Sequence, residues 1–275
     1  MSNSQLRGIR RISLAVTGLA LLGGALLGGA KPAQASGSGL SYYPSTDIYP
    51  KGNLHFDADY FGSTNGKNTS GTFLGLEYGA GPEHDGLFGR TEFGIDFAAS
   101  ANGASYGDRL YFNAKTQLFN KPDAGIRATL GVYGVGTKDA LASNWVNLLA
   151  SKAFSFGRIH IGAAHALRDD FVTKRTVLQL GYDKAINDKF IFAMDYQSGR
   201  DQFISPGIIY LLNDKAGIEL SYGRGGKSFE GTGLRNQIYF GFDYNFGKVY
   251  APPTSPDAPA GEAGAGGGGG GGGGG

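Results

Sequence analysis

The chain is 275 residues long, which allows one or two globular domains or one medium-sized barrel. Glycine accounts for 49 residues and aromatic residues for 12%, whereas cysteine is absent, so a disulfide framework and thiolate chemistry are excluded. The formal net charge of +2 gives no indication of a nucleic-acid partner.

Residues 1–35 have the pattern of a secretory signal peptide. Arg7, Arg10 and Arg11 precede an apolar stretch over 12–30, and residues 33–35 (Ala-Gln-Ala) supply a small-x-small cleavage site. A single transmembrane anchor is the alternative, because the stretch is about long enough. Its glycines and the cleavage sequence favour export. Cleavage removes four of 25 basic residues and leaves 21 against 23 acidic ones, a net charge of −2.

Residues 36–52 are rich in Gly, Ser, Pro and Tyr, and we expect an extended segment on the periplasmic side that leads into the next region. Residues 53–246 show alternation of apolar and polar residues, as in the run Glu-Phe-Gly-Ile-Asp-Phe over 92–97. A period of two places the two sets on opposite faces of a strand. A soluble secreted β-protein would bury the apolar face, and a membrane barrel would turn it toward lipid.

The spacing of these runs predicts about twelve strands. Between 145 and 212 the candidates are residues 144–154, 157–167, 174–183, 189–197 and 203–212. Short turns at 120–123, 155–157, 185–188 and 213–215 alternate with longer polar connections at 62–70, 98–108, 135–143, 167–173, 198–202 and 224–233. This alternation is typical of outer-membrane barrels. The connection at 80–86 is long for the end of the barrel at which the short turns are expected.

The predicted fold class is therefore all-β: a closed antiparallel up-and-down transmembrane β-barrel over 53–246, with both ends on the periplasmic side. A sheet in hydrocarbon must have no unpaired edge, which requires closure. The tail, residues 247–275, is rich in Pro, Ala and Gly, and we expect it to be disordered.

The last predicted strand ends in Tyr244-Asn245-Phe246 and resembles the aromatic-ended strand that bacterial outer-membrane proteins present to the barrel assembly machinery. In this chain about thirty residues follow it. Residues 44–52 and 195–199 are similar to short segments of porin-like barrel families. The resemblance implies a porin-like barrel that is assembled by this machinery, and it carries over no functional residue.

Several short motifs have ordinary structural explanations. Residues 103–107 (Gly-Ala-Ser-Tyr-Gly) match a nucleophile elbow, but they lie in a polar loop with no helix after them. Residues 226–228 (Gly-Lys-Ser) match only the end of a phosphate-binding loop. His84 lies between two acids in a turn that could bind a divalent ion weakly, although a solvated turn is favoured.

Two further histidines bear on the question of an enzyme. His160 and His165 are five residues apart on one predicted strand, so they should lie on opposite faces. Some outer-membrane barrels are lipid-processing enzymes with a Ser–His pair on the surface, and Ser151 lies on the strand before His165. No diagnostic spacing surrounds these residues. We therefore expect no enzyme, no cofactor and no metal.

Charged residues at alternate positions of spanning strands should face the lumen, because lipid exposure would be costly. The predicted lumen-lining residues are Asp57, Asp59, Glu77, Arg90, Glu92, Asp96, Lys115, Arg127, Asp195, Glu219 and Asp243. Acids outnumber bases among them, so an open path would favour cations or neutral polar solutes. A closed interior filled by salt bridges is the alternative, because a barrel of this size is narrow.

The sequence thus predicts a monomeric porin-like barrel in the outer membrane of a diderm bacterium. It would contact outer-membrane lipid and pass small polar solutes. The second hypothesis is a structural or interaction barrel with a plugged lumen, and the third is a lipid-processing enzyme.

Overall fold

The computed structural model describes residue 40 and residues 42–64, 70–99, 109–136, 144–169, 172–230 and 235–247. The signal peptide (1–35), the motif at 103–107 and the tail beyond Gly247 lie outside these ranges. Within them, no helix is long and apolar enough to cross a membrane.

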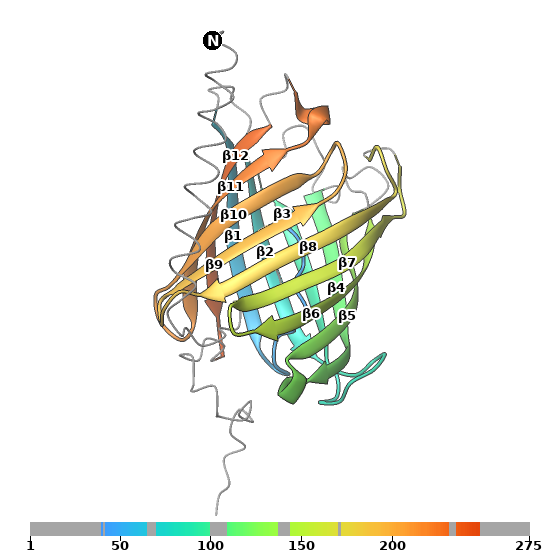
Figure 1. Cartoon of the computed structure of the whole chain (residues 1–275), viewed down its shortest axis with the longest axis vertical. Helices are drawn as coiled ribbons and strands as arrows, with labels where there is room; N and C mark the ends of the chain where they lie inside the picture. The colour runs from blue at the N-terminus through green and yellow to red at the C-terminus, as the bar shows by residue number, and fades with distance from the viewer. Residues whose placement is uncertain are drawn as a thin grey trace, which may run out of the picture.

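Twelve antiparallel strands form one closed barrel, in which each strand pairs with its neighbours in sequence and β1 pairs with β12 (Figure 1). The strands are β1 (Leu54–Ser63), β2 (Ser70–Ala80), β3 (Thr91–Ala98), β4 (Leu110–Lys121), β5 (Ile126–Gly136), β6 (Trp145–Phe154), β7 (Gly157–Ala166), β8 (Thr176–Ala185), β9 (Phe190–Gln197), β10 (Phe203–Leu211), β11 (Ala216–Gly225) and β12 (Asn236–Asn245). The predicted fold class and strand number are confirmed. The five candidate strands between 145 and 212 agree to within two residues at each end.

The alternation in sequence becomes an apolar exterior and a polar interior. Phe93, Leu148 and Leu220 lie on the outer face and are 56%, 54% and 58% exposed. Their neighbours in sequence on the inner face, such as Glu92, Asn147 and Glu219, are at most 4% exposed. In water such an exterior would be unfavourable, whereas hydrocarbon solvates it well.

The connections differ between the two ends of the barrel. One end carries short connections at 122–125, 155–156, 186–189 and 212–215, and we call it the short-turn end. The connection between β2 and β3, residues 81–90, is the exception at this end. It folds onto β4, because the Gly86 amide donates to the Gln117 carbonyl and the Asn120 amide donates to the Asp85 carboxylate.

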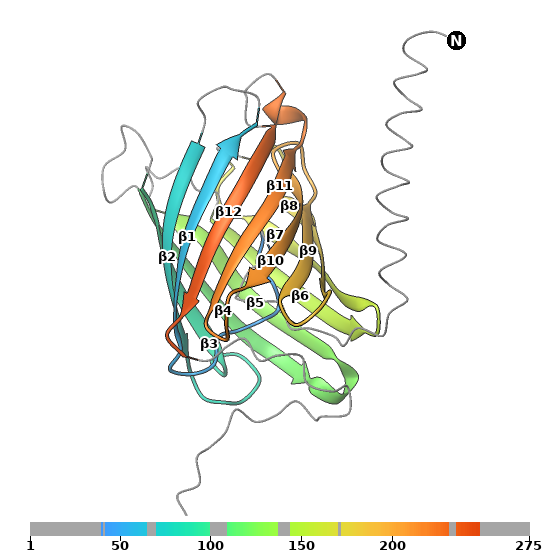
Figure 2. The same ribbon diagram turned by 90° about the vertical axis from the view of Figure 1, so that its left-hand side faces the viewer.

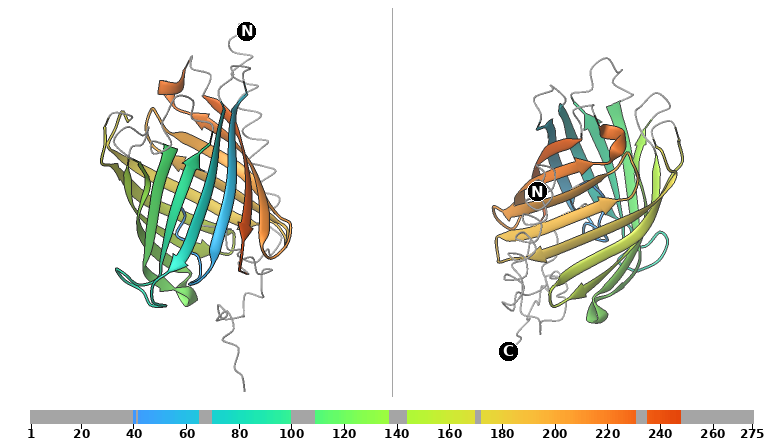
Figure 3. Two further views of the ribbon diagram at one scale, coloured as in Figure 1. Left: turned by 180° about the vertical axis from the view of Figure 1, so that it is seen from behind. Right: turned by 45° about the horizontal axis from the view of Figure 1, so that its top comes forward.

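The chain that precedes β1 runs inside the barrel, where Figures 2 and 3 show it as a blue trace behind the strands. We call Leu40 together with residues 42–52 the inserted segment. At the short-turn end the Gly52 amide donates to the Gly79 carbonyl, just before β1 begins. At the other extreme the Tyr42 hydroxyl donates to Gln237, at the start of β12. The extended segment expected at 36–52 therefore occupies the lumen over its described part.

A charge on the outer face tests the membrane-facing surface. Leu220→Arg, in the middle of β11, should destabilise the barrel by about 2–4 kcal/mol in a bilayer, because the guanidinium would face hydrocarbon. Leu87→Arg is the matched control, since Leu87 is 59% exposed but lies in the connection outside the strands. Urea unfolding in phospholipid vesicles measures both. Equal and small effects would contradict a lipid-facing β11.

Candidate functional site

The inserted segment is held most strongly at Asp47. The Arg158 guanidinium of β7 donates to both Asp47 oxygens at 2.6 and 2.7 Å, and Arg127 of β5 donates to one of them at 2.5 Å. Asp183 of β8 accepts from Arg158 at 3.0 Å and lies 2.7 Å from His160. Bidentate pairing of this kind is strong and fixes orientation. Asp47 therefore ties the segment to β5 and β7, and through Arg158 to Asp183 of β8.

Burial by itself would raise the pKa of the Asp47 carboxyl, but the two guanidinium groups have the larger combined effect. Arg158 acts by charge and by hydrogen bonding, and Arg127 acts by charge. The pKa of Asp47 is consequently held well below its ordinary value. The carboxylate stays ionised through the neutral and mildly acidic range. Its pairing with Arg127 and Arg158, which we call the Asp47 clamp, therefore persists there.

Two tyrosines anchor the segment near the opposite end of the barrel. The amides of Tyr42 and Tyr43 both donate to one oxygen of Asp195 in β9, at 2.7 and 3.0 Å. The Tyr43 hydroxyl donates to Gln202, and the Tyr42 ring stacks on Phe203 at 5.1 Å. Burial raises the pKa of both phenols, so they remain protonated donors.

At other positions the segment contacts the wall through its backbone. Lys115 donates to the Ser45 carbonyl at 3.0 Å, and the Tyr49 amide donates to Glu92 at 3.0 Å. A Cβ at Gly79 would lie 2.1 Å from the Pro50 carbonyl oxygen, so only glycine permits this approach. The segment is thus packed against the wall of the lumen.

A cavity of about 300 Å³ remains beside the inserted segment. Seven carboxylates line it, accompanied by one lysine and one histidine. The carboxylates belong to Asp57, Asp59, Glu77, Glu92, Asp96, Glu219 and Asp243. Lys115 pairs with Glu92 at 3.4 Å, while Asp59 accepts from Tyr239 and Asp96 accepts from Asn113. The lumen is therefore strongly acidic where it is hollow.

The predicted lumen set separates into three groups. The seven acids above and Lys115 line the cavity. Arg127 and Asp195 also face inward, but they hold the inserted segment. Arg90 departs from the prediction, because it lies just before β3 and pairs with Glu83 at 2.9 Å in the 81–90 connection.

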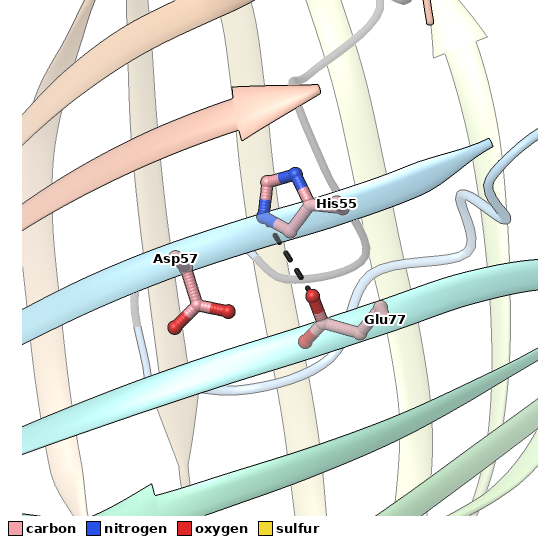
Figure 4. Close-up of side chains that lie close together, drawn as sticks. All are labelled: His55, Asp57 and Glu77. Atoms are coloured by element: carbon pink, nitrogen blue, oxygen red, sulfur yellow. Dashed lines mark ion pairs between the residues drawn. The ribbon is translucent and has the colours of Figure 1, made fainter. Parts of the chain in front are cut away.

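Three residues at the β1–β2 wall bring potential metal ligands together. One ligand atom from each of His55, Asp57 and Glu77 lies within 4.8 Å of the others (Figure 4). His55 and Asp57 share the inward face of β1, and Glu77 stands opposite His55 on β2. Asp243 of β12 approaches the same imidazole nitrogen, Nε2, at 3.3 Å.

The structure also places the residues of the other motifs. His160 is buried in the lumen and His165 is exposed on the outside, as their spacing predicted. Ser151 is buried and shares a hydrogen bond of 2.5 Å with Thr46. Ser151 and His165 therefore lie on opposite faces and cannot act as a Ser–His pair.

The two loop motifs take up ordinary loop structure. Residues 227–229 form a short 3-10 turn after Gly226, and the Ser228 amide donates to the Arg200 carbonyl. In the 81–90 connection, Glu83 pairs with Arg90 and Asp85 accepts from Asn120, while His84 contacts the Asp85 carbonyl.

The sequence analysis did not predict that the segment before β1 enters the lumen. It also did not predict the contacts that Arg158, Asp183 and His55 make there. The strand pattern does carry a signal for His55, which has the same parity as Asp57 and Asp59 on β1. Its approach to Glu77 depends on the register between β1 and β2, which alternation alone does not define.

No known protein-family model matches the chain, and no curated protein sequence matches it. Solved structures of similar architecture include Salmonella typhi OmpF in complex with daunomycin, at 10% identity and a TM-score of 0.40, covering 70% of this chain and 96% of that one. Escherichia coli outer membrane phospholipase A aligns at 9% identity and 0.44, covering 74% and 95%. A mutant Rh. blastica porin aligns at 9% and 0.30, covering 70% and 99%. The chain resembles bacterial outer-membrane barrels in architecture only.

Removing the carboxylate at position 47 tests the clamp. Asp47→Asn should lower the free energy of unfolding at pH 7 by about 3 kcal/mol, because it leaves the buried Arg158 guanidinium with Asp183 as its remaining partner and removes the partner of Arg127. Fluorescence of Trp145, the only tryptophan, can follow urea unfolding. Equal stability of variant and wild type would contradict a stabilising clamp.

The same carboxylate predicts a pH dependence. Its pKa is lowered in the folded protein, so its contribution is complete above the ordinary value of about 4 and is lost as pH falls toward the lowered one. The stability difference between wild type and Asp47→Asn should therefore shrink below about pH 4. A difference that grows as the pH falls would contradict this assignment.

Proposed function

We propose that the chain is a monomeric outer-membrane barrel of a diderm bacterium that passes small cations and neutral polar solutes through its acidic lumen. The observation that carries the proposal is the acid-lined cavity of about 300 Å³ between the inserted segment and the barrel wall. A cavity lined by carboxylates lowers the energy of a cation and raises that of an anion. The apolar outer face supports a membrane location.

The inserted segment limits the size of the solutes. It runs from the short-turn end to the start of β12 and occupies the side of the lumen nearest β5–β10. The free space lies toward β1–β3 and β12, where most of the carboxylates are. Only small solutes would pass alongside a segment that is clamped in this way.

A closed, structural barrel is the second candidate, and the Asp47 clamp favours it. Two guanidinium groups, from β5 and β7, hold the segment at Asp47, and Asp195 fixes it again near the other end. A segment held at both extremes would act as a permanent plug. Conductance measurements separate the two candidates.

Planar-bilayer recording of the folded full-length mature protein should give discrete, cation-preferring conductance. Replacing Asp96 and Asp243 together by Asn should move the reversal potential in a KCl gradient toward zero, because two lumen charges are lost. Glu230→Gln is the control, since Glu230 pairs with Arg235 in the exposed β11–β12 connection. Absence of conductance from folded protein would favour the plug.

Deleting residues 36–49 tests the inserted segment directly. The barrel strands remain intact, so the variant should keep its heat-modifiable mobility in gels while its single-channel conductance rises severalfold. The physical reason is that the deletion fills with water the space that the segment occupies. Conductance unchanged from that of the wild type would mean that this segment does not constrict the path.

A further inference from the structure

A chain of hydrogen bonds that begins at a backbone amide determines the tautomer of His55. The Gly247 amide donates to Asn53 Oδ1 at 2.8 Å, so the other atom of this side-chain amide, Nδ2, is a donor. Asn53 Nδ2 donates to Asn245 Oδ1 at 3.1 Å, which makes that oxygen an acceptor. His55 Nδ1 lies 3.0 Å from the same oxygen and must therefore carry a proton.

The second imidazole nitrogen consequently faces carboxylates. In neutral His55 the lone pair of Nε2 would point toward Glu77 Oε2 at 3.7 Å and Asp243 Oδ1 at 3.3 Å. Lone pairs that face one another repel unless a proton or a metal ion lies between them. The Tyr49 ring stacks on the imidazole at 4.6 Å and holds its plane, so the ring has little freedom to turn away.

Two carboxylates in this group have no lysine or arginine partner among the described residues, and Glu77 has only the His55 imidazole, 3.7 Å away. Asp57 is 9% exposed and makes no hydrogen bond or ion pair in the part of the chain that the structure describes. Glu77 Oε2 is fully buried and accepts no hydrogen bond there. Lys115, the lysine of the cavity, is 3.4 Å from Glu92 and donates to the Ser45 carbonyl. Leaving buried carboxylates of this kind ionised is costly unless a cation lies beside them.

We propose that His55, Asp57 and Glu77 form a lumenal binding site for a divalent transition-metal ion of the Zn²⁺ class, with a carboxylate oxygen of Asp243 as a fourth ligand beside it. Zinc binds imidazole nitrogen and carboxylate oxygen at about 2.0–2.2 Å, which places ligand atoms of a tetrahedral site about 3.3–3.6 Å apart. The distance from Nε2 to Asp243, 3.3 Å, falls within this range, and the distance to Glu77, 3.7 Å, lies just above it. Asn245, which accepts from Nδ1, is the partner that a metal-bound histidine ordinarily has.

The site lines the cavity, so an ion can reach it from the lumen. The proposal does not depend on solute passage, because a barrel that conducts nothing could still bind the metal. It also differs from a general attraction of cations to acids, since one imidazole nitrogen is an essential ligand. Loss of binding on replacing His55 is therefore the discriminating result.

The test uses the folded mature protein in detergent after treatment with a chelator. Titration with Co²⁺ should give visible absorption bands of a nitrogen- and oxygen-ligated ion, and Zn²⁺ should displace it at one equivalent per chain. His55→Ala and Glu77→Gln should each weaken Zn²⁺ affinity at least about tenfold. His165→Ala is the control and should leave affinity unchanged, because His165 lies on the outer face.

Glu77→Gln keeps the size of the side chain, so it tests the site even where His55→Ala fails to fold. Asn245→Ala adds a positioning test: Zn²⁺ binding should weaken, while the Co²⁺ bands should still show a nitrogen ligand. The proposal is overturned by a lack of saturable Zn²⁺ binding. It is equally overturned if Ca²⁺ competes as well as Zn²⁺ and His55→Ala changes neither affinity, because the cluster would then be an oxygen-only acidic patch.

Discussion

The pairing of β1 with β12 leaves the sheet without a free edge, as hydrocarbon surroundings demand. Closure also divides every strand into an inner and an outer face, and the alternating sequence assigns apolar residues to the outside. Charged residues are thereby gathered in a narrow interior, where each needs water, a partner or a counter-ion. The ion pairs and the cavity of the lumen are consequences of this closure.

Charged side chains in the interior are arranged differently in two regions of the barrel. Near β5–β8 the basic groups Arg127 and Arg158 meet Asp47 and Asp183, so charges of both signs balance within the protein. Near β1–β3 and β12 the acids exceed the bases, and the space beside them stays open. The inserted segment lies between the two regions. It neutralises one of them and contributes Tyr49 to the wall of the other.

Strand number, strand bounds and facing were predictable because a period of two is a local property of the sequence. The alternation over 92–97 and 237–246 indicates directly which side chains face the outside of the barrel. Contacts across the lumen were not predictable, since Asp47 is separated from Arg158 by 111 residues and no local pattern links them. Alternation predicts facing only within a strand. Arg90 has the same parity as the inward residues of β3, but it precedes the first residue of that strand and pairs with Glu83. The Pro, Gly and Tyr composition of 36–52 predicted an extended segment on the periplasmic side, but nothing in that composition indicated that the segment enters the lumen.

Because the chain is synthesised from its N-terminus, the inserted segment is made before all the strands that it contacts. Its residues precede every strand, yet the hydrogen-bond partner of Tyr42, Gln237, follows 195 residues later, and that of Tyr43, Gln202, follows 159 residues later. Contacts at such sequence separation bring a large loop-closure entropy and form slowly. The earliest described residues of this protein are therefore among the last to reach their native partners, and the lumen acquires its final shape only when nearly the whole wall is in place.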